Sequence, residues 1–237
     1  MIHFCKVEKT FLFLFFALCF SKVFCVPHFA INPVDSSIHS CNFNKHFPPY
    51  YDSLSHRFIL RNEKATFGRK FLRGSLEVVG YNILSTSLLF VLPEHLSNWH
   101  QPYPGKVNEQ YRKTFSRAPV VDADVWYINY LGHPYQGACY YNAVRSQGAK
   151  FWQAGLFCLG HSLVWEYIAE GGLEQPSIQD IVVTPVVGSL LGELIHYGTV
   201  KMSRNGFAWY EKTFVCIFNP MFAINNGFKY AKKTPAF

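Results

Sequence analysis

Apolar residues recur along most of the chain with the three-to-four-residue spacing of helices, and the breaks between them fall at proline and glycine. A helical pattern over residues 70–92 ends before Pro93; at 1.5 Å per residue it reaches roughly 33 Å, the thickness of a bilayer. Further helices are predicted at 107–116, from 134 to a capping glycine at 148, and over 150–170 and 178–202. A last apolar segment, 213–228, breaks at Asn219-Pro220. Because no stretch alternates as a strand does, the sequence predicts an all-α bundle of about five helices.

The N-terminal 25 residues are typical of a secretory signal peptide. Lys6 and Lys9 precede an apolar run over residues 10–20 that is too short to span a bilayer, and Val23 and Cys25 suit a cleavage site. We expect a signal peptide over residues 1–25, with an uncleaved anchor as the alternative. Residues 26–68 have no sustained period and predict a loosely structured lead-in, and residues 69–237 make up the predicted helical domain.

Two helix starts carry recognisable end signals. Pro134 suits a first helical position, which places His133 in the capping region, and Gly148 suits the end of the same helix. Ser177 and Asp180 have the spacing of a capping box. In that box the Ser177 hydroxyl accepts from the backbone N–H of Asp180, and the Asp180 carboxylate accepts from the N–H of Ser177.

Composition and charge restrict the class of protein. The 237 residues are 49% hydrophobic and only 16% charged, which excludes a disordered chain. The net charge is +7, without a nucleic-acid-binding motif, so an anionic lipid surface is the expected partner and nucleic acid is not. Membrane association is therefore expected, and whether the helices span a bilayer or lie on it stays open. The basic residues concentrate at Arg57, Arg61, Lys64, Arg69, Lys70 and Arg73 and at Lys229, Lys232 and Lys233.

The cysteines give little evidence for a disulfide bond or a metal site. Four cysteines follow the predicted signal peptide, enough for two disulfides whose pairing stays open: Cys41, Cys139, Cys158 and Cys216. The last three lie in apolar helical stretches, which favours free buried thiols. No Cys/His spacing is typical of zinc, and a set of Glu166, Glu170 and His161 lacks ligand spacing. No metal ligand and no cofactor is expected.

A series of short motifs gathers between residues 122 and 193. They are NYLGHPY at 129–135, Tyr141 and Arg145 before Gly148, WEY at 165–167 with Glu170, PSIQD at 176–180, TP at 184–185, Gly188, and GE at 192–193. With these motifs the region resembles an uncharacterised bacterial family, the domain of unknown function number 3943. The resemblance implies an envelope protein. Because that family has no established activity, the resemblance brings no catalytic residues.

Polar residues within this region fall at helical spacing. Glu166 and Glu170 lie four apart on one predicted helix face, as do Tyr141 and Arg145 on another. Because a buried charge needs a partner, Arg145 is expected to meet Glu166 or Glu170 inside the bundle. The small residues among Asp180, Thr184, Gly188, Gly192 and His196 would let two helices approach closely.

Two interpretations follow for these residues. In the first, His133 and one of the two glutamates form an acid–base pair; in the second, Arg145 and a glutamate form a buried ion pair that fixes helix register, and His133 and Asp180 are caps. The candidate catalytic residues are His133, Arg145, Glu166 and Glu170. The candidate structural residues are Tyr141, Trp165, Ser177, Asp180, Thr184, Gly188 and Glu193.

The sequence therefore predicts an exported, membrane-associated helical protein of the cell envelope, at the periplasmic face of a membrane or in the outer membrane, with a lipid-binding or structural role. The alternative is a hydrolase or transferase that modifies membrane lipid or cell wall with Glu and His. The enzyme needs His133 and a glutamate within about 3 Å, or one water, of a shared space. The scaffold needs Arg145 neutralised.

Overall fold

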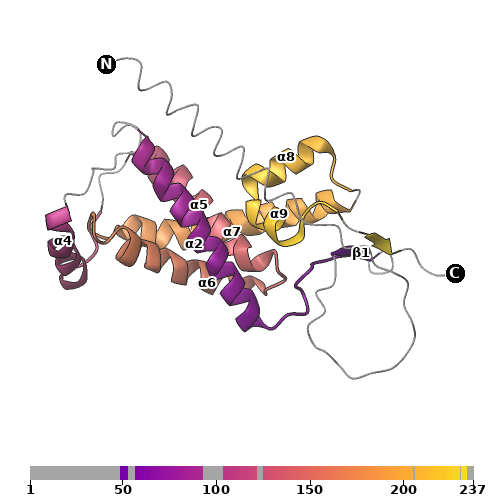
Figure 1. Cartoon of the computed structure of the whole chain (residues 1–237), viewed down its shortest axis with the longest axis horizontal. Helices are drawn as coiled ribbons and strands as arrows, with labels where there is room; N and C mark the ends of the chain where they lie inside the picture. Colours follow the sequence, from indigo (N-terminus) through magenta and orange to yellow (C-terminus); the bar gives the residue numbers. More distant parts are fainter. Residues whose placement is uncertain are drawn as a thin grey trace, which may run out of the picture. The chain divides into compact units, whose positions relative to one another are not determined.

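A computed structural model describes residues 49–52, 57–92, 104–121, 125–204, 206–229 and 231–233 (Figure 1). Most of these residues are helical, which confirms the all-α class. The signal peptide predicted over residues 1–25 and most of the predicted lead-in lie outside the described residues. The α-helices are α2 (Phe67–Val91), α4 (Pro104–Ser116), α5 (His133–Arg145), α6 (Phe151–Val164), α7 (Ile178–Ser203), α8 (Trp209–Phe218) and α9 (Pro220–Asn226).

The helix boundaries agree closely with the predicted ones, with two additions. A π-helical turn, η1 (Ile128–Gly132), precedes α5, and a second, η2 (Trp165–Ala169), follows α6. The predicted break at Asn219-Pro220 separates α8 from α9, and the Asn219 side chain caps α9 by accepting from the Phe222 N–H. Gly148 adopts a φ of 84° after α5, as the predicted terminal glycine should.

Three strands of three residues each form a small sheet that periodicity does not reveal. They are β1 (Tyr50–Asp52), β2 (Arg57–Ile59) and β3 (Ala231–Lys233), in the order β2-β1-β3. Strand β1 pairs antiparallel with β2 and parallel with β3, so that Tyr51 stands opposite both Phe58 and Lys232. Three residues are too few for the alternation of faces to register in a sequence.

Helix α5 is the centre of the bundle and is buried over most of its length. Helices α2, α6, α7 and α9 all pack on it (Figure 1). Tyr140 and Val144 of α5 contribute to a core with Val78, Phe157 and Met221. A second core beside the small sheet joins Phe58 and Leu60 to Phe207, Val215 and Phe222.

Helices α5 and α7 approach so closely that glycine is required where they touch. A Cβ on Gly188 would lie 2.6 Å from the Cα of Gly137, and a Cβ on Gly192 would lie 2.8 Å from the ring of Tyr141. The expected close approach of two helices is thus confirmed. Because the contacts advance together along both helices, from Gly137 with Gly188 to Tyr141 with Gly192, α5 and α7 run parallel.

The cysteines agree with the prediction where they are described. Cys139 and Cys158 are buried, Cys216 is half-buried, and all three are free thiols. Burial raises the pKa of both Cys139 and Cys158 to about 12, so neither is a thiolate near neutral pH. Cys41 lies outside the described residues.

Candidate functional site at the N-terminal ends of α5 and α7

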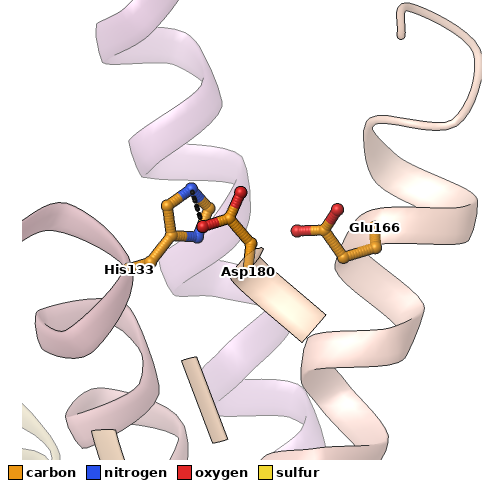
Figure 2. A group of neighbouring side chains, drawn as sticks. All are labelled: His133, Glu166 and Asp180. Carbon is orange, nitrogen blue, oxygen red and sulfur yellow. Dashed lines mark ion pairs between the residues drawn. The ribbon is translucent and has the colours of Figure 1, made fainter. Parts of the chain in front are cut away.

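Three side chains from three elements converge at one end of the α5–α7 pair. His133 is the first residue of α5, Asp180 lies in the first turn of α7, and Glu166 belongs to η2. One nitrogen or oxygen atom of each lies within 4.8 Å of those of the other two, and Figure 2 shows the Asp180 carboxyl group turned toward His133 and the Glu166 carboxyl group turned toward Asp180. The exposed fractions are 7% for His133 and 3% for each carboxylate, so the group is buried. We call these three residues the acid–imidazole cluster.

Both π-helical turns lie next to the acid–imidazole cluster. The turn η1 ends where the backbone N–H of His133 bonds to the Ile128 carbonyl, and η2 contains Glu166. At the end of η2 the Glu170 N–H bonds to the Trp165 carbonyl at 2.9 Å. Such turns are rare, and they occur frequently at functional sites because they redirect the side chains that a regular helix would present elsewhere.

His133 is held by a neighbour on α7 and is not a helix cap. Its Nδ1 shares a hydrogen bond of 3.2 Å with the Thr184 hydroxyl, and its Nε2 lies 3.6 Å from Asp180 Oδ1. No side-chain hydrogen bond caps the start of α5, so the expected capping role of His133 is wrong. The reason is that η1 continues directly into α5, which leaves no free helix end to cap.

The predicted capping box is correct in one half and wrong in the other. The Ser177 hydroxyl accepts from the Asp180 N–H at 3.2 Å, as predicted. The Ser177 N–H, however, donates to Glu166 Oε2 at 3.0 Å, so a distant glutamate takes the place that the box assigns to Asp180. The Asp180 carboxylate is directed toward His133 instead. Both carboxylates thereby lie at the positive end of the α7 dipole, which favours their charged forms.

A small cavity opens beside the cluster. It offers about 10 Å³ to the centre of a water-sized sphere, roughly the room that a single water needs. Four of its lining side chains are carboxylates and none of those described is lysine or arginine; the lining is His133, Glu166, Glu170, Glu174, Gln175, Ser177 and Asp180. Helix α4 is fastened to the turn that carries Glu170 and Glu174, through hydrogen bonds such as the one of 2.7 Å from Thr114 to the Gly171 carbonyl.

Arg145 does not meet Glu166 or Glu170, and the predicted pairing is wrong. Its guanidinium forms a bidentate pair with Glu193, with Nε 2.8 Å from Oε2 and Nη2 2.9 Å from Oε1. The Tyr141 hydroxyl also donates to Glu193, at 2.6 Å. Burial alone would raise the pKa of Glu193, but the hydrogen bonds from Arg145 and Tyr141 outweigh it and lower that pKa.

The spacing along the two parallel helices explains this partner. Arg145 is 12 residues beyond His133, and Glu193 is 13 residues beyond Asp180, so both lie roughly 18–20 Å further along their helix axes. Because η2 lies beside the beginning of α7, Glu166 is out of reach of Arg145. The residues that meet lie equally far along two parallel helices. Once α5 and α7 are known to be parallel neighbours, the sequence spacing alone predicts this pair.

The other predicted candidates divide into members and neighbours of the site. Glu170 lines the cavity, Trp165 is buried next to Glu166, and Thr184 holds His133. His161 lies elsewhere, since its Nε2 bonds to the Ser75 hydroxyl of α2 at 3.0 Å. Two lining residues, Glu174 and Gln175, were not among the predicted site residues; both follow the Gly171-Gly172 turn, and their place in the lining depends on that turn.

Fold and site together define a mostly helical protein with a buried imidazole–carboxylate site. Residues 118–221 match the model of the uncharacterised family described as "Domain of unknown function (DUF3943)", so this segment of the chain is similar to that family. The segment contains the whole acid–imidazole cluster and the Arg145–Glu193 pair. No curated protein and no solved structure gives a significant match to the chain.

Proposed function

We propose that this is an exported protein that associates with a membrane of the cell envelope, where it binds lipid or supports other membrane components. The observation that carries the proposal is the inverted distribution of its side chains. Many large apolar side chains point outward, whereas Asn142, Gln147, Asn219 and Asn225 are almost fully buried. A protein in water normally arranges these two kinds of side chain the other way round.

Helix α7 presents the inversion most clearly. Its outward stripe holds Val182, Val186, Leu190 and Leu194, spaced four apart and 53%, 55%, 62% and 68% exposed. Its inward stripe holds polar and small residues, from Asp180 through Thr184 to His196. Contiguous apolar surface of this extent is typical of contact with another apolar phase, and polar residues turned toward the bundle interior are typical of membrane helices.

Helix α2 repeats the arrangement on another side of α5. Leu72, Leu76, Val79 and Ile83 are 64%, 67%, 51% and 63% exposed, at the spacing of one helix face. By length and composition alone, α7 is also the one helix among the described residues that is long and apolar enough to cross a membrane. We call the outward stripes of α2 and α7 the apolar belt.

The basic residues contribute less to the proposal than their number suggests. The Lys70 amino group is buried and donates to the Glu63 and Gly148 carbonyls at 2.9 and 3.0 Å. Arg73 pairs with Glu77 at 3.1 Å. These two basic groups have structural partners, so the proposal rests on the apolar belt and not on charge.

Membrane fractionation tests the proposal. The wild-type chain should remain in the membrane pellet after high salt and alkaline carbonate, which remove proteins held by charge alone. The double variant Leu190→Glu/Leu194→Glu should move to the supernatant because it places two carboxylates in the belt. Lys201→Glu is the matched control, since it makes the same change of two charge units at an exposed site on the same helix. Wild-type protein in the soluble fraction, or a double variant still in the pellet, would contradict the proposal.

The acid–imidazole cluster supports a second candidate, a hydrolase or transferase acting on membrane lipid or cell wall. His133 with Glu166 or Asp180 has the residue types of a general acid–base pair, at separations that one water can bridge. The cavity holds about one water, however, so a substrate would require the site to open. Turnover of phospholipid vesicles or cell-wall fragments by the wild type, lost in Asp180→Asn, is the expected result for an enzyme.

A further inference from the structure

We propose that His133, Glu166 and Asp180 bind one divalent transition-metal ion of the class of Zn²⁺, Mn²⁺ or Fe²⁺. This proposal replaces the expectation from the sequence that no metal is held. It is independent of membrane association, because it concerns the interior of the bundle.

The distances within the cluster suit a shared ion better than a direct contact. His133 Nε2 and Asp180 Oδ1 are 3.6 Å apart, which is too long for a hydrogen bond. Two ligands of one tetrahedral ion, each bonded at about 2.0–2.2 Å, stand roughly 3.4 Å apart. The widest separation in the cluster is within 4.8 Å, so a movement of each ligand atom by up to about 0.8 Å toward a common centre gives all three residues bonding distance to one ion.

The carboxyl groups of the cluster are also suited to a cation. Two carboxyl groups and one imidazole lie together, and all three are buried. Glu170 and Glu174 add two more carboxylates to the cavity lining. Burying like charges is costly unless a proton or a cation offsets them. A divalent ion offsets both carboxylates of the cluster at once.

Neighbouring groups hold two of the three ligands in an orientation ready for metal. Thr184 engages His133 Nδ1 at 3.2 Å, which leaves Nε2 directed at the cluster. The Ser177 N–H fixes one oxygen of Glu166 at 3.0 Å. Metal-binding histidines almost always use their second ring nitrogen in this way, and such outer contacts set the direction of the ligand lone pair.

The donor set selects the class of ion. Imidazole suits zinc and iron and carboxylate suits manganese, whereas magnesium and calcium prefer oxygen ligands alone. Three protein ligands leave at least one coordination position open. The cavity has about the room for one water at that position.

Metal titration of the purified full chain, stripped with chelator and kept in detergent, tests the proposal. The wild type should take up one equivalent of Zn²⁺ or Mn²⁺ by equilibrium dialysis. With Co²⁺ as a coloured substitute for zinc it should develop visible d–d absorption. Its melting temperature should rise with Zn²⁺ concentration, because an ion that binds only the folded state stabilises that state.

Conservative variants assign the site. Asp180→Asn and Glu166→Gln should each weaken Zn²⁺ binding at least tenfold, and both keep the shape of the side chain. Asp180→Asn leaves the backbone N–H that bonds to Ser177, and Glu166→Gln retains an oxygen to accept from the Ser177 N–H. Glu193→Gln is the control: it removes a carboxylate from the same helix pair at the far end, and it should bind Zn²⁺ like the wild type.

Several outcomes overturn the proposal. They are no uptake and no Co²⁺ absorption by the wild type, equal affinity in Asp180→Asn and Glu166→Gln to that of the wild type, or a rise in melting temperature with Mg²⁺ or Ca²⁺ alone. If the carboxylates instead share a proton, the wild type melts at one temperature with and without Zn²⁺, which also overturns the proposal. If a variant fails to fold, the wild-type Co²⁺ spectrum and melting curves still decide between these outcomes.

Discussion

Ionisable side chains are arranged differently at the two ends of the α5–α7 pair, the end with Arg145 and Glu193 and the end with His133 and Asp180. At the far end, Arg145 and Glu193 form a bidentate ion pair at 2.8 and 2.9 Å, and Tyr141 supplies a further hydrogen bond. At the near end, His133 and Asp180 remain 3.6 Å apart, beside a second buried carboxylate and a small cavity. The α5–α7 pair thus has a completed ion pair at one end and, together with η2, a buried group of two carboxyl groups and one imidazole at the other.

The two ends of the α5–α7 contact therefore have different roles: the ion pair is structural, and the acid–imidazole cluster is the candidate functional site. The Arg145–Glu193 pair satisfies its own charges and fixes how the helices are aligned. The acid–imidazole cluster brings two carboxyl groups and one imidazole together, and the closely packed glycines Gly137 and Gly188 lie between the two ends. The ion pair can therefore be changed without touching the cluster, while the glycine contact affects both.

The largest expected effect comes from adding a methyl group to the contact between the two ends. Gly188→Ala places a Cβ 2.6 Å from the Gly137 Cα and 2.8 Å from its carbonyl carbon, both backbone atoms that cannot turn aside. We expect a loss near the upper end of the range of about 1–3 kcal/mol typical of overpacking, measured by denaturant unfolding. Zn²⁺ affinity should also fall at least tenfold, because α5 and α7 separate.

Gly198→Ala is the control for that variant. Gly198 lies on the same helix, and no heavy atom lies within 4 Å of the place that the added methyl group would take. Alanine there should keep or raise stability by up to about 1 kcal/mol through its helix propensity. Equal losses of stability in the two variants would show that the close approach at Gly188 is not what matters.

The next-largest effect is expected from breaking the ion pair between Arg145 and Glu193. Arg145→Ala should lower the unfolding free energy by about 1.5–3 kcal/mol, as for hydrogen bonds to charged groups. A fully buried pair would cost about 3–5 kcal/mol, but the two side chains are 23% and 32% exposed, which permits water to reach the remaining Glu193. Zn²⁺ affinity should stay within about twofold of wild type. A loss of metal binding with unchanged stability would reverse the roles of the two ends.

Sequence periodicity located the helices but not the partners of their polar residues. The starts of α5, α7 and α9 can be predicted from Pro134, Ser177 and Asn219, because the residues that begin a helix act on backbone groups within the next three positions. The choice of Glu193 for Arg145 depends on α5 and α7 being parallel, which no local signal contains. Local reasoning therefore describes the elements, and the site requires their arrangement.

The π-helical turns are the second reason that the site escaped prediction. Helical-wheel reasoning treats Glu166 as part of a regular helix and Asp180 as the partner of Ser177. In the structure η2 carries Glu166 to the Ser177 N–H, and the Asp180 carboxylate is directed at His133. A helical wheel assumes a constant period of 3.6 residues, so it does not reveal the extra residue of a π-helical turn.

A pH-dependent effect is expected beside the completed ion pair. Burial, with a contribution from the charge of Arg145, lowers the pKa of His196 to about 4. Because the unfolded chain binds this proton near its ordinary pKa of about 6.5, the stability due to neutral His196 is present above that pH and is lost as pH falls toward 4. From pH 7 to pH 5 the loss should be about 2 kcal/mol greater in wild type than in His196→Gln. Parallel pH profiles of unfolding free energy for the two proteins would contradict this assignment.

The smallest effect concerns the start of α7. Ser177→Ala removes the hydroxyl that accepts from the Asp180 N–H at 3.2 Å but keeps the backbone N–H that donates to Glu166. The loss should be about 0.5–2 kcal/mol, as for other N-cap side chains. Since Asp180 stays in the first turn, Zn²⁺ affinity should fall by less than about threefold. Ser87→Ala, which removes a hydroxyl bonded only to the Ile83 carbonyl on an exposed helix face, is the matched control and should change stability by less than about 0.5 kcal/mol. A tenfold loss of Zn²⁺ affinity in Ser177→Ala would mean that the cap positions the metal ligand Asp180, which would join the end of α7 to the acid–imidazole cluster as one unit.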